Sequence, residues 1–365
     1  MWTLLFLLFV VLLFTAPLIP ALSELWWPRD IQALNIDYDH DRSITRFARK
    51  LAALSRDQLE GLNLSGATAA DSQASDDVLI VMEDAGIALC QEEMGRRMMK
   101  RQLIAKKNLM LPDKFYFARE VYAVGNIQSG MENHFRALFA EGNVLLKARC
   151  EVARWVHAIR LQIGPDVVLY GRASAEEEIH FLGAARFERL NAPCILFGAL
   201  NQRSSADLAC DCAANKRTPA LESITALIEQ RFDEGRTIAV GDLTLPANTV
   251  LEGDLVVRGR LRIGAGALVN GSIKAHRGIQ MEKGVTVRGA VVSSGRIVCG
   301  THALIDGPVI SEQAVWIGYG SRIGSVISPT SVSAPVIKIY ACDTVAYGTL
   351  WARERGEAVS RRPAL

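Results

Sequence analysis

Four phrases of the sequence decide the fold, because each places one apolar residue two positions before a glycine and another two positions after it. They are Leu251-Glu-Gly253-Asp-Leu255, Val269-Asn-Gly271-Ser-Ile273, Val287-Arg-Gly289-Ala-Val291 and Ile305-Asp-Gly307-Pro-Val309. The glycines follow one another at intervals of 18 residues, and the column Leu255, Ile273, Val291 and Val309 keeps the same interval. A fixed period of this size is typical of stacked copies of one small unit. The sequence therefore predicts a repeat protein.

Each period contains three short strands. Apolar-x-apolar pairs recur about every six residues, as in Leu255/Val257 and Leu261/Ile263. Alternation at period two places both members of a pair on one face of a strand. Three such strands in 18 residues describe one triangular coil of a β-solenoid, with glycine at a corner where it can adopt a positive φ. A β-sandwich of short strands is the alternative, but it does not require a constant spacing. We predict an all-β solenoid fold.

The same pattern occurs upstream of the four phrases. Residues 161–173 align with residues 261–273 at an offset of 100, and looser coils extend back to about Phe115. The period is interrupted after about Gly198 and resumes near Thr237. Within the interruption, Pro219 to Phe232 has apolar residues at helical spacing. This pattern predicts a loop and a helix inserted between two solenoid blocks.

The N-terminus has the composition of a membrane anchor. The first 23 residues carry no charged side chain, and the apolar run is long enough to span a bilayer core as a helix. A cleaved signal peptide is the alternative, although the segment lacks the basic region that such peptides carry. Because Arg29 and Arg42 follow the segment, the positive-inside rule places the rest of the chain in the cytoplasm.

Residues 24–111 are predicted to form helices and a linker. Ser43 to Leu59 has the pattern of an amphipathic helix with Ile44, Phe47, Leu51 and Leu54 on its apolar face. Glu92 to Lys107 resembles a helix with a charged outer face, suited to covering the open end of the solenoid. The predicted domains are an anchor at 1–23, this region at 24–111, a first solenoid block at 112–199, an inserted loop and helix at 200–236, the main block at 237–350 and a disordered tail at 351–365.

Composition excludes several functional classes. The formal charge is +2, and we find no basic stripe interleaved with aromatic residues, so a nucleic-acid partner is not expected. The seven cysteines are scattered and predict no disulfide framework, which fits a reducing compartment. Cys210 and Cys212 are too few to form a convincing metal site. No motif for a nucleotide, another cofactor or a catalytic metal is present, so we expect none of these ligands.

The recurring apolar-x-Gly-x-apolar phrase, in a domain of short apolar-x-apolar strands, resembles the bactofilins, which are bacterial polymer-forming cytoskeletal proteins. The resemblance covers about 237–350 well and 115–198 loosely. It implies a right-handed β-helix that polymerises end to end without nucleotide, lies at the bacterial inner membrane and recruits envelope-building or morphogenetic enzymes. The implied partners are other copies of the chain, the membrane through residues 1–23, and an unidentified envelope or polysaccharide-synthesis protein. On this resemblance the protein is a non-enzymatic scaffold involved in cell shape.

The alternative function is acyl transfer by a left-handed β-helix of the hexapeptide-repeat type. Apolar residues at every sixth position, such as Leu245, Leu251 and Val257, approach the pattern of that family. Its members use a histidine as general base on the acceptor group. The candidates here are His276, which follows a strand pair, and His302, which shares a corner column with Gly266 and Gly284. Neither has an evident carboxylate to orient it, so the scaffold is the preferred interpretation.

Overall fold

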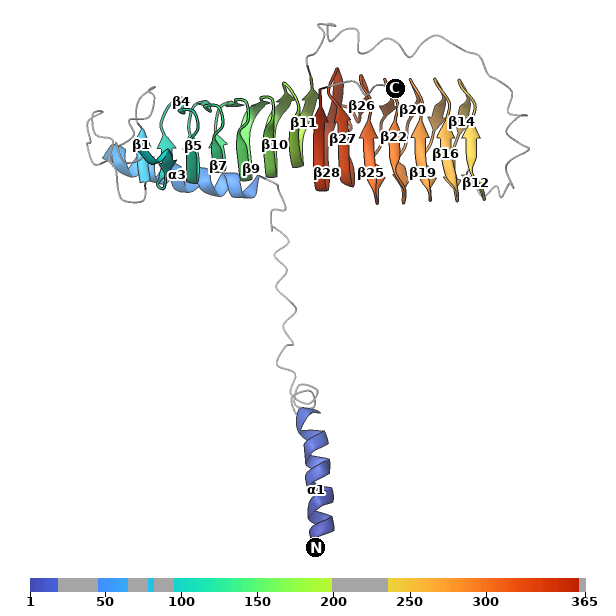
Figure 1. The fold of residues 1–365 in the computed structure, drawn as a ribbon, viewed down its shortest axis with the longest axis horizontal. Helices are drawn as coiled ribbons and strands as arrows, with labels where there is room; N and C mark the ends of the chain where they lie inside the picture. Colours follow the sequence, from blue (N-terminus) through green and yellow to red (C-terminus); the bar gives the residue numbers. More distant parts are fainter. Residues whose placement is uncertain (19–44, 65–77, 82–94, 199–235, 361–365) are drawn as a thin grey trace. The chain divides into compact units, whose positions relative to one another are not determined.

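The computed structural model shown in Figure 1 describes residues 1–18, 45–64, 78–81, 95–198 and 236–360. The chain divides into two compact units, residues 1–43 and 44–365, and each is described by itself.

The first unit contains helix α1 (Trp2–Thr15) and a short 3-10 helix η1 (Ala16–Leu18). The anchor predicted over 1–23 is therefore helical over a shorter stretch, and residues 19–23 lie outside the described residues. A proline at position 17 lacks the backbone N–H that would continue the α-helix. At 1.5 Å per residue, α1 is only about 21 Å long. Among the described residues, no helix is both long and apolar enough to cross a membrane.

The second unit is a β-solenoid of about twelve turns with a spacing of about 18 residues, which confirms the predicted fold. One half, called block 1, contains the strands β1 (Val78–Val81), β2 (Met98–Met99), β3 (Gln102–Ala105), β4 (Leu109–Met110), β5 (Tyr116–Ala123), β6 (Ile127–Gln128), β7 (His134–Ala140), β8 (Val144–Leu146), β9 (Glu151–Ile163), β10 (Val167–Phe181) and β11 (Ala185–Phe197).

The other half, called block 2, contains the remaining strands. They are β12 (Arg236–Ala239), β13 (Leu243–Leu245), β14 (Val250–Glu252), β15 (Asp254–Val257), β16 (Arg260–Ile263), β17 (Leu268–Asn270), β18 (Ile273–Ala275), β19 (Gly278–Met281), β20 (Thr286–Val287), β21 (Val291–Ser293), β22 (Ile297–Cys299), β23 (Leu304–Ile305), β24 (Val309–Ser311), β25 (Ala314–Ile317), β26 (Arg322–Ile323), β27 (Thr330–Tyr340) and β28 (Thr344–Val359).

Each coil has three faces, and each face is a ladder of strands stacked along the solenoid axis. Long strands such as β9, β10 and β28 bend at the corners and contribute to more than one face. Face A joins β2, β5, β7, β9, β10 and β11 of block 1 with β28, β27, β25, β22, β19, β16 and β13 of block 2. Face B joins β1, β3, β5, β7, β9, β10 and β11 with β28, β27, β24, β21, β18, β15 and β12. Face C joins β4, β6, β8, β9, β10 and β11 with β28, β26, β23, β20, β17 and β14.

The inward side chains of all three faces form one hydrophobic core that runs through both blocks. In block 2, Leu255 pairs with Ile273, Ile273 with Val291 and Val291 with Val309, and each of these side chains is at most 1% exposed. The 18-residue period therefore places one apolar side chain above the next. In block 1 the interval is less regular: Leu103 pairs with Val121, and Val121 pairs with Leu138.

The two blocks meet through their last strands, β11 and β28, which pair antiparallel, whereas all other pairings are parallel (Figure 1). This contact is called the joint. Block 1 advances towards the joint from β1, and block 2 advances towards it from β12. The chain visits the faces in the order A, B, C in block 1 and B, A, C in block 2. Because the direction of travel and the order of faces both reverse, the two blocks have the same hand. The direction in which the chain advances along the solenoid axis therefore reverses at the joint.

The solenoid extends further in both directions than the predicted boundaries. Strands β2 and β3 lie within the stretch 92–107 that resembled a helix, so block 1 begins before residue 112. Strand β28 continues to Val359, so most of the tail predicted at 351–365 belongs to the last coil. Its charged residues point outward while Leu350, Ala352 and Ala358 are buried, and this alternation forms a half-buried strand. The inserted segment predicted at 200–236 lies almost entirely outside the described residues.

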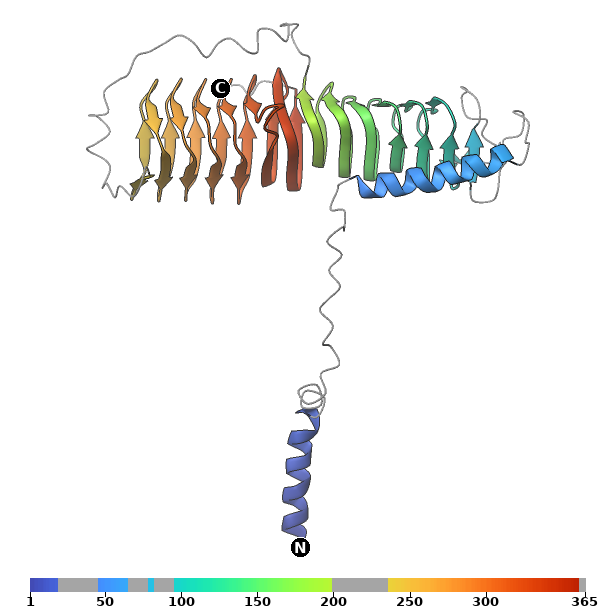
Figure 2. The ribbon, with the colours of Figure 1, turned by 180° about the vertical axis from the view of Figure 1, so that it is seen from behind.

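Helix α3 (Arg46–Leu64) lies along face B of block 1 and not across its end (Figure 2). Its buried side chains include Ala48, Ala52 and Leu59, which pack on outward apolar side chains of the sheet. Those sheet residues are Ile80, Ile104, Tyr122 and Phe139. The predicted apolar face was wrong in part: Leu51 packs against this cluster, but Phe47 and Leu54 are 57% and 64% exposed. Ile44 lies outside the described residues. Ala48 and Ala52 face the sheet beside Leu59, and these two small residues let the helix approach the large side chains of face B closely.

The four repeat glycines occupy the corner between faces C and B. Only Gly253 among them has a positive φ, so positive φ does not explain the column. A Cβ at Gly289 would lie 2.6 Å from the backbone of Gly271, and one at Gly271 or Gly307 would clash with the coil before it in the same way. Close approach of successive backbones therefore requires glycine here. Positive φ occurs at a different corner, where Asn248, Gly266, Gly284, His302 and Gly320 stack.

Candidate functional site

The joint is held together by packed side chains and hydrogen bonds, as successive coils are within either block. Phe181 and Phe197 pair across the last two coils of block 1, and their rings stack with centroids 4.8 Å apart. The ring of Phe187 packs over Gly356 of β28, its partner across the joint. On face B, Asn191 Nδ2 donates a hydrogen bond of 2.8 Å to Thr349 Oγ1. A coil of this cross-section therefore accepts an antiparallel coil on all three faces.

A groove of about 440 Å³ crosses the joint on face A. Its charged lining residues come from both blocks: Arg186 is paired in the ladder with Glu357, and Glu357 with Lys338. Arg355 Nε lies 3.1 Å from Glu357 Oε1, so this carboxylate already has a cationic partner within its own strand. The groove has mixed charge and no cluster of one sign.

A second groove, of about 320 Å³, lies on face A of block 1. Its outward residues Tyr116, His134 and Glu151 occupy successive rungs of the ladder. The rings of Tyr116 and His134 lie 6.3 Å apart, and His134 Nδ1 lies 3.2 Å from Glu151 Oε2. Arg154 and Tyr170 line the same groove. Aromatic rings and charged groups thus converge in one depression on an otherwise regular sheet.

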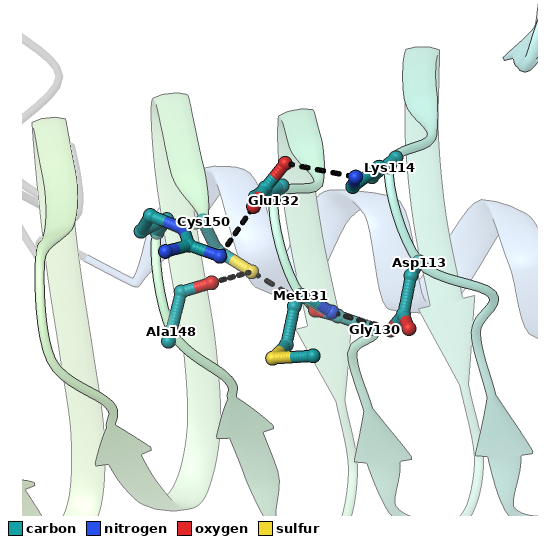
Figure 3. A network of polar contacts seen from close by, with 8 residues as sticks. Asp113, Lys114, Gly130, Met131, Glu132, Ala148 and Cys150 are labelled. Carbon is teal, nitrogen blue, oxygen red and sulfur yellow. Dashed lines mark hydrogen bonds and ion pairs between the residues drawn. The ribbon is translucent and has the colours of Figure 1, made fainter.

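The corner between faces C and A of block 1 carries a ladder of charges, shown in Figure 3. Lys114, Glu132 and Arg149 follow one another on successive coils, each with a positive φ close to 57°. Glu132 forms ion pairs with both neighbours, at 3.8 Å from Lys114 Nζ and in close contact with Arg149. Just inside this corner, Cys150 Sγ donates to Gly130 O at 3.1 Å, and burial raises the pKa of the thiol. The thiol is therefore protonated, and Glu132 is the shared partner of the two cations of the ladder.

Helix α3 is held to face B by a three-residue cluster. Arg56 contacts Glu141 through two nitrogens, at 2.7 Å from Oε1 and 2.6 Å from Oε2, and the Tyr122 hydroxyl donates to the same carboxylate. Burial alone would raise the pKa of Glu141, but the hydrogen bonds from Arg56 and Tyr122 outweigh it and hold the pKa below its usual range. Burial and the hydrogen bond to Glu141 raise the pKa of Tyr122. The cluster links the helix to two coils.

A serine, a histidine and a glutamate meet further along face B. His157 Nδ1 and Ser174 Oγ share a hydrogen bond of 2.8 Å, and His157 Nε2 lies 3.8 Å from Glu176 Oε1. This set has the residue types of a hydrolytic triad. However, His157 is 5% exposed and Ser174 is 3% exposed, so the hydroxyl is not presented to a substrate. Burial lowers the pKa of His157. The hydrogen bond between His157 and Ser174 satisfies two buried polar groups at the end of the row of outward apolar side chains that α3 covers.

The two histidines proposed as acyl-transfer bases lie at different corners. His276 is exposed in the turn between β18 and β19, and His302 is exposed in the turn after β22, where its ring packs over Gly320. No side-chain partner is found for either histidine in the described part of the chain. Neither lines the two grooves described above. The structure therefore does not bring these residues together into one site.

The described residues contain no group of three or more His, Cys, Asp and Glu side chains that could hold a metal ion. Cys210 and Cys212 lie outside the described residues.

The groove on face A of block 1 was not found from the sequence. Its residues sit at the outward positions between the apolar columns of the looser upstream coils. Tyr116, His134 and Glu151 are separated by 18 and 17 residues, so they can be recognised as neighbours only when the register of these irregular coils is known.

In comparisons with known proteins, no protein-family model, curated protein or solved structure matches the chain.

Proposed function

We propose that this protein is a bactofilin-like structural scaffold that associates with itself end to end and presents its faces to envelope or polysaccharide-synthesis proteins. The joint is the observation that supports self-association best. It is an intramolecular contact between the ends of two solenoid blocks, with pairing along β11 and β28 on all three faces. A cross-section that stacks in this way within one chain is suited to stacking between chains.

The joint also limits which ends are available. Both C-terminal coils are used inside the chain, so the outer ends of the column are the N-terminal coils of the two blocks. At the end of block 2, β12, β13 and β14 each pair with only one strand among the described residues. A sheet edge of this kind is a template for pairing with another chain. Because every free end is N-terminal, each end-to-end contact would pair strands antiparallel, as the joint does.

The gain from such stacking comes mainly from backbone hydrogen bonds. Ala239, Leu243 and Leu245 of the first coil in block 2 are at most 2% exposed, so little further apolar burial is available there. We therefore propose an association that depends on protein concentration rather than a permanent polymer.

The N-terminal unit supports attachment to a membrane. Trp2, Phe6 and Phe14 of α1 are each at least 69% exposed, and apolar side chains surround the helix. A helix that is apolar all round requires a nonpolar environment. We propose that residues 1–23 associate with the bacterial inner membrane and that the solenoid lies on its cytoplasmic side.

The test of self-association is sedimentation velocity of the full chain in detergent over a range of concentrations, with negative-stain microscopy of the largest species. We expect the mean mass to rise with concentration. Thr244→Glu, on the outermost rung of face A, should reduce the association because like charges on paired edges repel. Gln280→Glu, two rungs further in on the same ladder, is the control. A strictly monomeric protein at all concentrations would reject the self-assembling scaffold.

Membrane attachment is tested separately by flotation with liposomes that contain anionic lipid. The full chain should float with the vesicles, whereas a chain lacking residues 1–23 should stay in the soluble fraction. Equal flotation of both proteins would show that the N-terminal segment is not the attachment site.

A further inference from the structure

The groove on face A of block 1 has the features of a ligand site that neither α3 nor the joint explains. Tyr116 and Tyr170 are each 50% exposed, although both project from strands of a regular sheet. They lie on rungs three coils apart, with His134 and Glu151 on the rungs between them. At about 4.8 Å per coil, the two tyrosines are separated by roughly 14 Å along the axis. A ligand that touches both rings must be elongated.

One arginine of the groove has no acidic partner of its own in the described ranges of the chain. His134 Nδ1 is 3.2 Å from Glu151 Oε2, and Arg136 Nε is 3.2 Å from Glu120 Oε1. Arg154 is exposed, lines the groove and has no side-chain partner among the residues that the structure describes. A ligand that pairs with Arg154 and avoids repulsion by the Glu151 carboxylate carries a single negative charge over the length of the groove. A polyphosphate or a nucleic acid, with one charge on every unit, would meet the carboxylate of Glu151 as well.

The backbone at this site fixes Arg154 beside Tyr170. A Cβ on Gly171 would overlap the carbonyl oxygen of Arg154, so only glycine allows the two coils to approach here. Because Tyr170 precedes Gly171 in the chain, its backbone lies next to the Arg154 rung, and both side chains line the groove. The main chain therefore fixes the two backbone positions from which the arginine and the tyrosine project.

The same backbone cannot bind an extended peptide as an added strand. The rungs of β5, β7, β9 and β10 on face A pair with strands on both sides, so their amide and carbonyl groups are used within the solenoid. Recognition must then come from side chains. Flat aromatic surfaces combined with polar and charged groups suit a chain of rings rich in hydroxyl groups.

From these observations we infer that the groove on face A of block 1 binds an acidic oligosaccharide, a linear chain of sugar rings with carboxylates on some of the rings. The rings stack on Tyr116 and Tyr170, and one carboxylate pairs with Arg154. This site does not depend on self-association, because it lies on a face of block 1 and not at an end of the column.

The test is isothermal titration calorimetry of the full chain in detergent with three hexasaccharides. One is a hyaluronan hexasaccharide, with a carboxylate on alternate rings; one is chitohexaose, which is neutral; and one is hexagalacturonate, charged on every ring. We expect the hyaluronan fragment to bind most tightly. Tyr170→Ala and Arg154→Gln should each weaken its binding about tenfold, the loss that corresponds to about 1.4 kcal/mol.

Two further variants distinguish the site from a general effect of charge or fold. Tyr170→Phe keeps the ring and should retain most of the affinity. Arg258→Gln removes an exposed arginine on block 2, at the corner where faces A and B meet, and should leave binding unchanged. All four variants should keep the melting temperature of the parent protein, because these side chains are exposed or, for Tyr170→Phe, retained in shape.

Three results would overturn the inference. They are no binding of any hexasaccharide at millimolar concentration, equal affinity for the neutral and the acidic chains, and unchanged affinity in both Tyr170→Ala and Arg154→Gln. Binding of a Glu-Gly repeat peptide in place of the saccharides would also overturn it and would assign the groove to an acidic peptide.

Discussion

The ring of Phe187 fills the space that a side chain at residue 356 would need, and these two residues are direct partners across the joint. The last coil of block 1 thus places one of its largest side chains against a glycine of the last coil of block 2. This complementarity joins two solenoid blocks of opposite direction into one core.

Substitution of Gly356 should weaken the joint. We expect Gly356→Val to lower the free energy of unfolding by about 1–3 kcal/mol, the usual cost of forcing extra methyl groups into a packed core. Urea denaturation followed by tryptophan fluorescence measures the change. Gly241→Val is the control, because a Cβ at Gly241 would meet no atom within 4 Å. Equal midpoints for the two variants would show that the joint adapts to the larger side chain.

Two glycines of block 2 should respond differently to the same substitution. Gly289 lies where a Cβ would meet the backbone of Gly271, whereas Gly284 has open space but a φ of 70°. Gly284→Ala should cost about 1–2 kcal/mol, the penalty for an L-residue in the left-handed region. Gly289→Ala should cost more, because backbone atoms must move.

An asparagine separates the two causes. Gly284→Asn should be close to neutral, since Asn248 occupies the same corner column with a φ of 56° and asparagine tolerates this conformation. Gly289→Asn should be as harmful as Gly289→Ala. Thermal denaturation of the four variants gives the order, and a neutral Gly289→Asn would contradict the close-approach explanation.

The cluster of Arg56, Tyr122 and Glu141 should make the docking of α3 sensitive to acid. The partners of Glu141 lower its pKa in the folded protein, so the stabilisation is complete above its ordinary pKa of 4.5 and is lost as pH falls through the lower folded value. Glu141→Gln should weaken docking at neutral pH and remove this dependence. Hydrogen exchange of α3 amides at pH 7 and below pH 4.5 measures both effects.

The control for this cluster is Glu177→Gln, which removes an exposed ion pair with Arg160 at 2.6 Å on the same block. Exposed pairs of this kind contribute little, so exchange in α3 should stay as in the parent protein. Equal exchange in Glu141→Gln and the parent would show that packing alone holds the helix.

The sequence predicts the solenoid well where outward residues are polar and poorly where they are apolar. In block 2 the inward columns stand out because residues such as Arg262 and Gln280 alternate with them. On face B of block 1, Ile104 and Tyr122 face outward but are covered by α3, so the alternation disappears. This is why the stretch around β3 resembled a helix.

The joint could not be predicted from the sequence for a different reason. An inward column such as Ile195 and Ala346 satisfies the same apolar pattern whether the two strands run parallel or antiparallel. The direction in which block 2 stacks on block 1 depends on where the chain re-enters after residues 199–235, and local periodicity carries no information about it.

The groove on face A could not be predicted because it depends on which outward residues become neighbours. Those neighbours follow from the register of the irregular coils in block 1, which the sequence pattern does not fix.

His157 should make the folded state less stable in mild acid. Burial lowers its pKa in the folded protein, and Arg49 adds to this, although Glu176 acts in the opposite direction. The unfolded chain therefore binds a proton more readily, so stability is complete above the ordinary histidine pKa of 6.5 and falls as pH drops below it. We expect the melting temperature of the parent protein to decrease between pH 7.5 and pH 5.5. His157→Gln keeps a hydrogen-bonding group near Ser174 but does not titrate, so its melting temperature should change less over the same interval. His276→Gln, at an exposed position, should retain the full pH dependence of the parent. If His157→Gln and His276→Gln show the same slope, the acid sensitivity comes from another group.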